Sequence, residues 1–181
     1  ALGLPLYQLL GGGDPQIKTD ITISVNDLDV MVADARIAVA AGFDCLKIKV
    51  GGHTWRDDVD SVLAIERAVG PHVALRLDAN QGWTPKHAVQ VIQAIEKAGV
   101  VLELVEQPVP ADDVVGLKFV TDHTLTPILA DEAVFSARQA LHILATGSAD
   151  IVNIKLMKTG GISQAIEVAN LARLHHKTCM V

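Results

Sequence analysis

Five short apolar runs of the sequence each end in a side chain that can be ionised. Two of these side chains are lysines and three are carboxylates: Lys49, Asp78, Glu106, Asp131 and Lys155. Each follows a run rich in β-branched and aliphatic residues, so each is expected at the carboxyl end of a buried strand. In parallel barrel folds the active site is built at this end of the strands. The pattern therefore predicts a catalytic centre rather than scattered surface charge.

The three carboxylates are candidate metal ligands. Asp78, Glu106 and Asp131 come from successive strands, and they converge on one spot if all three point inward. Carboxylates that share a low-dielectric site repel one another strongly, and a divalent cation relieves that repulsion. Oxygen ligands without His or Cys suit Mg²⁺, with Mn²⁺ as the alternative, rather than zinc. Asn80 and Glu132 are expected beside these ligands.

Lysines lie on both sides of the carboxylates. Lys49 shares a strand face with Lys47, because side chains alternate along a strand. In an eight-stranded barrel the strand of Lys155 lies opposite that of Lys49, so the two lysines face each other across the mouth. This placement predicts that a proton is removed from a carbon beside a carboxylate and returned to the opposite face. The metal would stabilise the enediolate that forms between the two steps.

The elements that must position these residues alternate regularly along the chain. Short apolar runs, expected as strands, are separated by longer amphipathic segments, expected as helices. The runs are Ile21–Val25, Cys45–Val50, Ala74–Asp78, Leu102–Glu106, Pro127–Asp131, Ile151–Lys155 and Thr178–Val181. Strand starts that recur every ~24–29 residues predict an α/β fold of the (β/α) TIM-type barrel class. A doubly wound sheet is the competing fold, but Ser24–Asp27 after the first run is not a glycine-rich phosphate loop.

The barrel is expected to be incomplete. About six to seven βα units are present, the sequence stops inside an apparent strand, and the last strands are expected to be missing. Residues 1–19 are assigned to the tail of a preceding domain and a linker, and residues 20–181 to the partial barrel that carries catalysis. We expect a helix over Asp27–Ala41, and a second that begins at Thr84–Pro85. The apolar stripe expected on the first helix is Val30, Ala33, Ile37, Val39 and Ala40.

Composition excludes several classes of protein. The 181 residues are 50% hydrophobic, which is too apolar for a disordered chain. The 21 acidic residues outnumber the 15 basic ones, and without a basic run they argue against nucleic acid. No apolar run approaches the ~18 residues of a membrane span, and no signal peptide opens the sequence. Cys45 and Cys179 form no disulfide framework, so a reduced, cytoplasmic setting is expected.

Five motifs together resemble the enolase superfamily, in its muconate-lactonizing, mandelate-racemase-like branch. The motifs are Lys47-Ile48-Lys49, Leu77-Asp78-Ala79-Asn80, Glu106-Gln107-Pro108, Ala130-Asp131-Glu132 and Asn153–Gly161. The resemblance implies that Asp78, Glu106 and Asp131 bind Mg²⁺ and that Lys49 and Lys155 are the acid/base catalysts. It also implies that residues 1–19 are the tail of the family's capping domain.

The resemblance extends to supporting residues and to a substrate class. It implies that Lys47 assists electrostatically and that Lys158 stands beside the ligands. Residues 19–26 and 154–158 look most like dipeptide epimerases that act on L-Ala-D/L-Glu, in which the threonine matching Thr22 contacts substrate. The expected partner is a small molecule, a dipeptide or an N-acyl amino acid, with no nucleic acid or membrane partner. A homo-oligomer is compatible with these expectations.

Other activities stay open at this point. An N-acyl amino acid racemase, a muconate-type cycloisomerase or an o-succinylbenzoate synthase would use much the same residues on another substrate. A Schiff-base aldolase would use Lys49 or Lys155 as a nucleophile, but it would not need three carboxylates. An inactive truncated fragment is the non-enzymatic alternative, since the parts of the family that select the substrate are expected to be missing.

Overall fold

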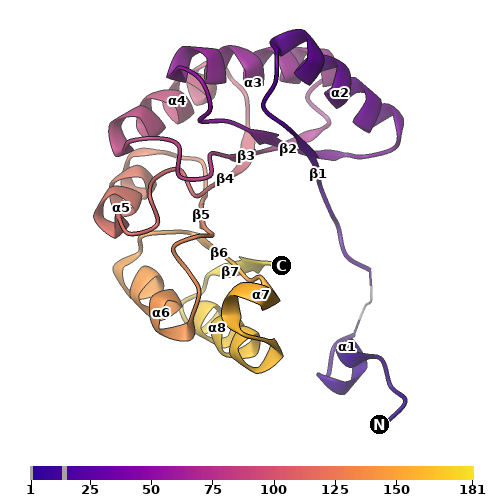
Figure 1. Ribbon diagram of the computed structural model, residues 1–181, viewed down its shortest axis with the longest axis vertical. Coiled ribbons are helices and arrows are strands. Elements are labelled where there is room, and N and C mark those ends of the chain that lie inside the picture. The colour runs from indigo at the N-terminus through magenta and orange to yellow at the C-terminus, as the bar shows by residue number, and fades with distance from the viewer. Residues whose placement is uncertain (1, 14–15) are drawn as a thin grey trace.

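The chain folds into a curled sheet of parallel strands with helices on its outer side (Figure 1). The computed structural model describes residues 2–13 and 16–181. The strands are β1 (Ile21–Ile23), β2 (Cys45–Lys49), β3 (Ala74–Asp78), β4 (Leu102–Glu106), β5 (Ile128–Ala130), β6 (Ile151–Asn153) and β7 (Thr178–Met180). The helices are α1 (Leu6–Leu9), α2 (Leu28–Ala40), α3 (Trp55–Val69), α4 (Pro85–Lys97), α5 (Val114–His123), α6 (Ala137–Thr146), α7 (Leu156–Thr159) and α8 (Ile162–Leu174). Across both described ranges, no helix combines the length and the apolar character that a membrane span requires.

The order of the strands identifies the fold class. A doubly wound sheet reverses its strand order at a switch point, whereas here each described strand pairs with the next one in the chain, from β1 to β7. Every one of these pairs is parallel. In Figure 1 the strands follow an arc with helices α2 to α6 and α8 on its convex side, while α1 lies apart from the arc. The prediction of an incomplete (β/α) barrel is therefore confirmed.

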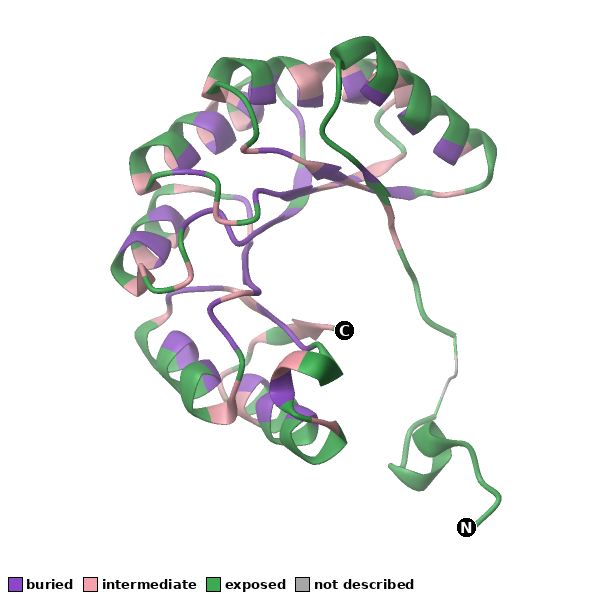
Figure 2. Cartoon of the chain, viewed as in Figure 1, coloured by how far each residue is buried: buried purple, intermediate pink, exposed green. Residues whose placement is uncertain are grey.

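The main core lies between the strands and the inner faces of the helices (Figure 2). In β2, Leu46 and Ile48 are fully buried on the helix side. Because side chains alternate along a strand, Cys45, Lys47 and Lys49 must then point to the inner side of the arc. Burial of each large aliphatic side chain stabilises the fold by about 1.5–3 kcal/mol. The apolar core therefore dictates which face the lysines take.

The helices begin at recognisable caps. Thr54 and Asp57 form a capping box at the start of α3, in which each side chain accepts from the other residue's backbone N–H. Thr84 accepts from the His87 N–H, and Pro85 occupies the first turn of α4, as predicted. The expected stripe on α2 is wrong: the helix buries Met31, Ala35 and Ala38, while Val30, Ala33, Ile37 and Ala40 are exposed and Val39 is half-buried.

Polar side chains line the inner side of the arc near the amino ends of the strands. Arg76 donates from Nη1 to Asp20 and from Nε to Glu103, each over 2.8 Å. The hydrogen bond from Arg76 holds the pKa of Glu103 below its ordinary value. Cys45 also contacts Glu103, with 3.7 Å between Sγ and Oε2. A cavity of about 390 Å³ opens beside this cluster, and Cys179 is one of its lining residues.

Both cysteines are expected to alkylate slowly in the folded protein at pH 8. Burial raises the pKa of Cys45 from 9.0 to about 11, and burial also raises the pKa of Cys179. The thiolate is the reactive form, so the rate at Cys45 should climb only as the pH approaches about 11. Cys179 lies on the edge strand beside the cavity and should react first.

Timed iodoacetamide labelling followed by peptide mass spectrometry measures the alkylation rate at each thiol. The urea-unfolded chain is the control, because both thiols regain ordinary pKa values there. Equal rates in the folded and unfolded chain at pH 8 would contradict this account of the two cysteines.

Candidate active site

The five ionisable residues at the strand ends lie along one edge of the sheet. Lys49, Asp78 and Glu106 are the last residues of β2, β3 and β4. The register pairs Lys49 with Asp78 and Asp78 with Glu106, so the three lie level on neighbouring strands. Asp131 directly follows β5, and Lys155 follows β6 by two residues. The carboxyl edge thus carries three acidic residues between two lysines, which is the placement that the sequence predicts.

Glu106 occupies the middle of this row. Its side chain is buried, with Lys47 Nζ 3.4 Å from Oε2, and its Oε1 accepts a 3.1 Å hydrogen bond from Asn153 Nδ2. Burial raises the pKa of Glu106, the nearby Asp78 and Asp131 raise it further, and Lys47 only partly opposes them. A carboxylate in this situation gains from any further positive charge beside it.

Asp131 is held by two lysines. Lys155 donates to Oδ2 over 2.5 Å, while Lys158 binds Oδ1 and also the backbone carbonyl of Asp131. Burial pushes the pKa of Asp131 upward, but the hydrogen bonds from the two lysines outweigh burial and leave it below its ordinary value. The ammonium of Lys158 also lies 5.4 Å from the centre of the Phe135 ring. These contacts hold the Lys158 ammonium beside Asp131.

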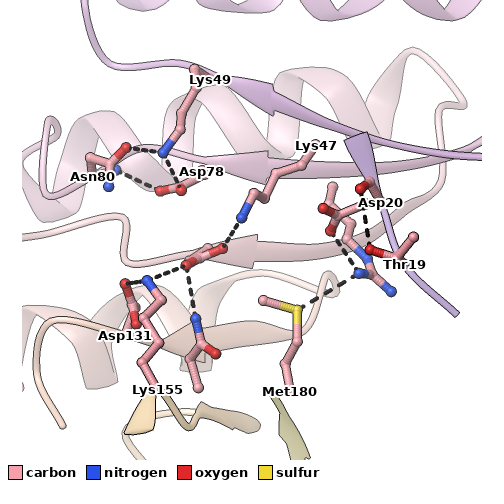
Figure 3. Close-up of polar contacts among 12 residues, drawn as sticks. Thr19, Asp20, Lys47, Lys49, Asp78, Asn80, Asp131, Lys155 and Met180 are labelled. Atoms are coloured by element: carbon pink, nitrogen blue, oxygen red, sulfur yellow. Dashed lines mark hydrogen bonds and ion pairs between the residues drawn. The ribbon is translucent and has the colours of Figure 1, made fainter. Parts of the chain in front are cut away.

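Lys49 stands at the other end of the row, as Figure 3 shows. Its Nζ lies 2.6 Å from Asp78 Oδ2 and 2.5 Å from Asn80 Oδ1. The amide of Asn80 also donates to Glu132 Oε1 over 3.1 Å. Asn80 and Glu132 thus lie beside the acidic row, and their hydrogen bond connects the loops after β3 and β5.

The four lysines differ in how far they reach solvent. The side chains of Lys49 and Lys155 are 28% and 43% exposed, whereas those of Lys47 and Lys158 are 17% and 7% exposed. A lysine that exchanges protons with a bound molecule must be reachable from the open face of the barrel. Lys49 and Lys155 meet that condition, and they lie on opposite sides of the acidic row (Figure 3).

The donor set of the row fits a hard divalent cation such as Mg²⁺. Asp78, Glu106 and Asp131 are buried and offer only oxygen atoms. Glu132 Oε2 is buried and, among the described residues, has no hydrogen-bond partner, so it is a further oxygen acceptor beside the row. Within the described ranges, no three His, Cys, Asp or Glu side chains are gathered as a complete ligand cluster. The carboxylates of the row contact lysine ammonium groups instead.

Thr22 lies on the inner side of β1, next to the lysine-bearing strand. The register pairs Thr22 with Lys47 across β1 and β2. Paired residues on neighbouring strands point to the same face of a sheet, so Thr22 shares the inner face with Lys47. Its side chain is exposed toward the opening of the arc. Contact between Thr22 and a substrate stays a prediction.

Gln107 has a positioning role that the sequence analysis did not assign. Its side chain is fully buried, and its Oε1 accepts from the backbone N–H groups of Asp131 at 2.9 Å and Ala133 at 3.1 Å. Its Nε2 donates to the Val109 carbonyl over 2.9 Å. The loop after β4 is thereby joined to the loop that carries Asp131. The available signal was an uncharged polar residue between Glu106 and Pro108 in an otherwise buried stretch.

Comparison with known proteins agrees with this geometry. The family model described as "Enolase C-terminal domain-like" matches residues 30–181. The L-Ala-D/L-Glu epimerase of Bacillus subtilis (strain 168) is 54% identical over 179 residues, which are 99% of this chain and 49% of that protein. The chain spans about half the length of the curated relatives it matches.

Two solved structures extend the comparison. A substrate-liganded complex of the L-Ala-D/L-Glu epimerase from Bacillus subtilis has a TM-score of 0.97 at 54% identity, and the match covers 99% of this chain and 50% of that one. A dipeptide epimerase from Enterococcus faecalis V583, complexed with Mg and the dipeptide L-Leu-L-Tyr, has a TM-score of 0.93 at 49% identity, over 97% of this chain and 49% of that one.

Proposed function

Since this chain belongs to the Enolase C-terminal domain-like family, we propose that it forms the barrel portion of a Mg²⁺-dependent dipeptide epimerase. The proposed substrate is L-Ala-D/L-Glu, and the reaction inverts the carbon beside the terminal carboxylate. The observation that carries the proposal is the row of three buried carboxylates with a reachable lysine bound at each end. The identity to epimerases named for this dipeptide supports the substrate.

The proton is moved by Lys49 and Lys155 in this proposal. One lysine, as the neutral amine, takes the α-proton from one face of the substrate carbon and becomes an ammonium. The other lysine, as the ammonium, gives its proton to the opposite face and becomes the amine. The two lysines thus exchange protonation states, and the total number of protons is unchanged. Lys47 and Lys158 take no part in these transfers and contact Glu106 and Asp131.

Asp78, Glu106 and Asp131 would hold the metal ion. A bound Mg²⁺ supplies positive charge that stabilises the enediolate oxygens formed when the α-proton leaves. Asn80 and Glu132 keep the neighbouring loops in place through their mutual hydrogen bond. Thr22 is proposed to contact the substrate from β1, because it shares the inner face with Lys47.

The wider organisation is proposed on the same basis. Residues 1–19 are assigned to the tail of a capping domain and a linker, and residues 20–181 to the catalytic barrel. The proposed setting is the cytoplasm, where a dipeptide is available and both cysteines stay reduced. The net charge of −6 gives no electrostatic attraction to nucleic acid.

Stereochemical analysis of incubated substrates tests the proposed function. The full-length protein with Mg²⁺ is incubated separately with L-Ala-L-Glu, an N-acyl amino acid and a cycloisomerase substrate, and the products are separated on a chiral column. We expect L-Ala-L-Glu to yield L-Ala-D-Glu until both isomers are present. Turnover of only the N-acyl amino acid or the cycloisomerase substrate would replace the dipeptide assignment. Borohydride trapping of a covalent adduct would instead identify a Schiff-base enzyme.

A further inference from the structure

The loops that follow β2 and β3 touch at their backbones, just beyond the acidic row. Gly51 and Gly82 face each other there, and a Cβ added to Gly82 would lie 2.8 Å from the Gly51 carbonyl oxygen. A Cβ added to Gly51 would lie 2.9 Å from the carbonyl oxygen of Ala79. Only glycine allows this close approach. The two loops are therefore in direct contact and cannot shift independently without opening a gap.

The buried carboxylate of Asp58 joins the same two loops through hydrogen bonds. Asp58, in the first turns of α3, accepts the Gly51 N–H at Oδ1 over 3.0 Å and the Trp83 indole N–H at Oδ2 over 2.8 Å. Asp58 and Trp83 are 3% and 4% exposed. Burial raises the pKa of Asp58, and the two hydrogen bonds oppose that rise. The hydrogen bonds from these two N–H groups thus offset part of the free-energy cost of burying the Asp58 carboxyl group.

These two loops carry residues of the acidic row. Gly51 lies two residues after Lys49. The second loop directly follows Asp78 and contains Asn80, and both of these residues bind the Lys49 ammonium. A backbone hydrogen bond of 3.0 Å from Val50 to the Asp78 carbonyl joins the loops above the Asp58 contact. Movement of either loop would therefore change the position of the Lys49 ammonium relative to Asp78.

An apolar pair would fill the space occupied by Asp58 and Trp83 without the cost of burying a polar carboxyl group. The hydrogen bonds of the polar pair also fix the relative orientation of the two loops, because hydrogen bonds weaken steeply when their angles change. Such directional hydrogen bonds are useful where a side chain must be held within a fraction of an ångström. Lys155 is not connected to Asp58 in this way, since it follows β6 on the other side of the row.

We propose that Asp58 and Trp83 are positioning residues that set the geometry of Lys49 and so govern the half of the reaction that Lys49 performs. This inference rests on the proposed two-lysine function. Loss of the Asp58–Trp83 contact should misalign Lys49 and slow its proton transfer, but leave the transfer by Lys155 unaffected. A purely structural role for Asp58 and Trp83 would instead affect both lysines alike.

The Trp83→Phe variant tests the proposal, because it keeps a buried aromatic ring and removes the N–H donor together with the rest of the five-membered ring. Exchange of the substrate α-proton with D₂O is followed separately for L-Ala-L-Glu and L-Ala-D-Glu, and the Lys49→Ala and Lys155→Ala variants identify which isomer each lysine serves. In Trp83→Phe we expect kcat for the Lys49 isomer to fall on the order of 10- to 100-fold, the loss that a small misplacement causes. KM for that isomer, and exchange of the other isomer, should change less than about two-fold, because neither depends on Lys49 alignment.

Matched control variants separate the effect of losing the Asp58–Trp83 hydrogen bond from a general effect of substitution in this region. Trp55→Phe makes the same change at the start of α3, where Trp55 packs against Arg56, and it should leave exchange of both isomers unchanged. Asp58→Asn keeps the side-chain volume but turns an amide N–H toward one of the two donors, so it should reproduce the Trp83→Phe pattern. Asp60→Asn, on the exposed side of α3, is its control. Should Trp83→Phe fail to fold, Asp58→Asn carries the same test.

Hydrogen–deuterium exchange of the backbone gives a readout that does not depend on activity. Peptides that cover residues 50–53 and 79–84 should exchange faster in Trp83→Phe and Asp58→Asn than in the wild-type chain. Equal slowing of both isomers, or looser loops with normal exchange of the Lys49 isomer, would overturn the proposal. A wild-type protein that exchanges neither isomer would instead refute the proposed function, while the backbone measurement would still report whether Asp58 and Trp83 hold the loops.

Discussion

Replacing Lys49 or Lys155 with alanine is expected to abolish net epimerisation, while each variant still exchanges the α-proton of one stereoisomer. Inversion needs a base on one face and an acid on the other, so the loss of either lysine stops the full reaction. The remaining lysine still reaches the α-proton of the isomer that points toward it. General acid–base groups contribute on the order of 10²–10⁴-fold to rate, and a loss of this size is expected for the blocked isomer.

Solution NMR in D₂O measures this exchange for L-Ala-L-Glu and L-Ala-D-Glu with each variant. The control is Lys118→Ala, which removes an exposed lysine that pairs with Asp122 on α5. That variant should exchange and invert both isomers at the wild-type rate. If Lys49→Ala and Lys155→Ala exchange both isomers normally, these lysines are not the two bases.

The Asp78→Asn variant is expected to bind Mg²⁺ on the order of 10- to 100-fold more weakly, or worse. Even residues that only support metal ligands cost this much when they are changed, and Asp78 is proposed as a ligand itself. Asn keeps the side-chain volume but removes the negative charge beside Glu106, whose pKa burial and Asp78 both raise. The metal site would therefore lose charge without a change in packing.

Isothermal titration with Mg²⁺ gives the affinity of the Asp78→Asn variant, and a thermal melt shows that it is folded. Asp34→Asn makes the same change on the exposed side of α2 and should bind the metal like the wild-type chain. Lys49→Ala should also retain Mg²⁺ binding, because it removes a base and not a proposed ligand. Wild-type affinity in Asp78→Asn would contradict the ligand assignment.

The strand pattern and the strand ends could be predicted because they depend on local sequence. Alternation in Cys45–Lys49 placed both lysines of β2 on one face, and the structure turns Leu46 and Ile48 to the helices. The bounds of the two strands Ala74–Asp78 and Leu102–Glu106, and the Thr84–Pro85 start of α4, follow from short-range signals. These signals do not require knowledge of what lies across the sheet.

The buried face of α2 could not be predicted so well. The helix has apolar residues around most of its circumference, so periodicity alone does not single out one face. The residues that the helix buries are Met31, Ala35 and Ala38, and none of them belongs to the predicted stripe. Small side chains at two of these positions allow α2 to lie close to its neighbours, a preference that only tertiary packing reveals.

The hydrogen bonds that connect the loops also could not be predicted from the sequence pattern. Asp58 meets Trp83 across 25 residues, and Gln107 meets the Asp131 N–H across 24. No local periodicity connects such partners, because the contacts exist only once the strands are in register. The same holds for the register shift between Leu75 and Arg76, beyond which Asp78 pairs with Glu106.

The measurement that tests the central claim most directly is α-proton exchange of L-Ala-L-Glu in D₂O, with Mg²⁺ and with a chelator. The account predicts that the glutamate α-proton signal disappears in the presence of protein and Mg²⁺, while the alanine α-proton persists. Chelation should stop the exchange, and added Mg²⁺ should restore it. A folded, Mg²⁺-binding protein that leaves the glutamate α-proton in place would contradict the claim that this row of carboxylates and lysines epimerises the dipeptide.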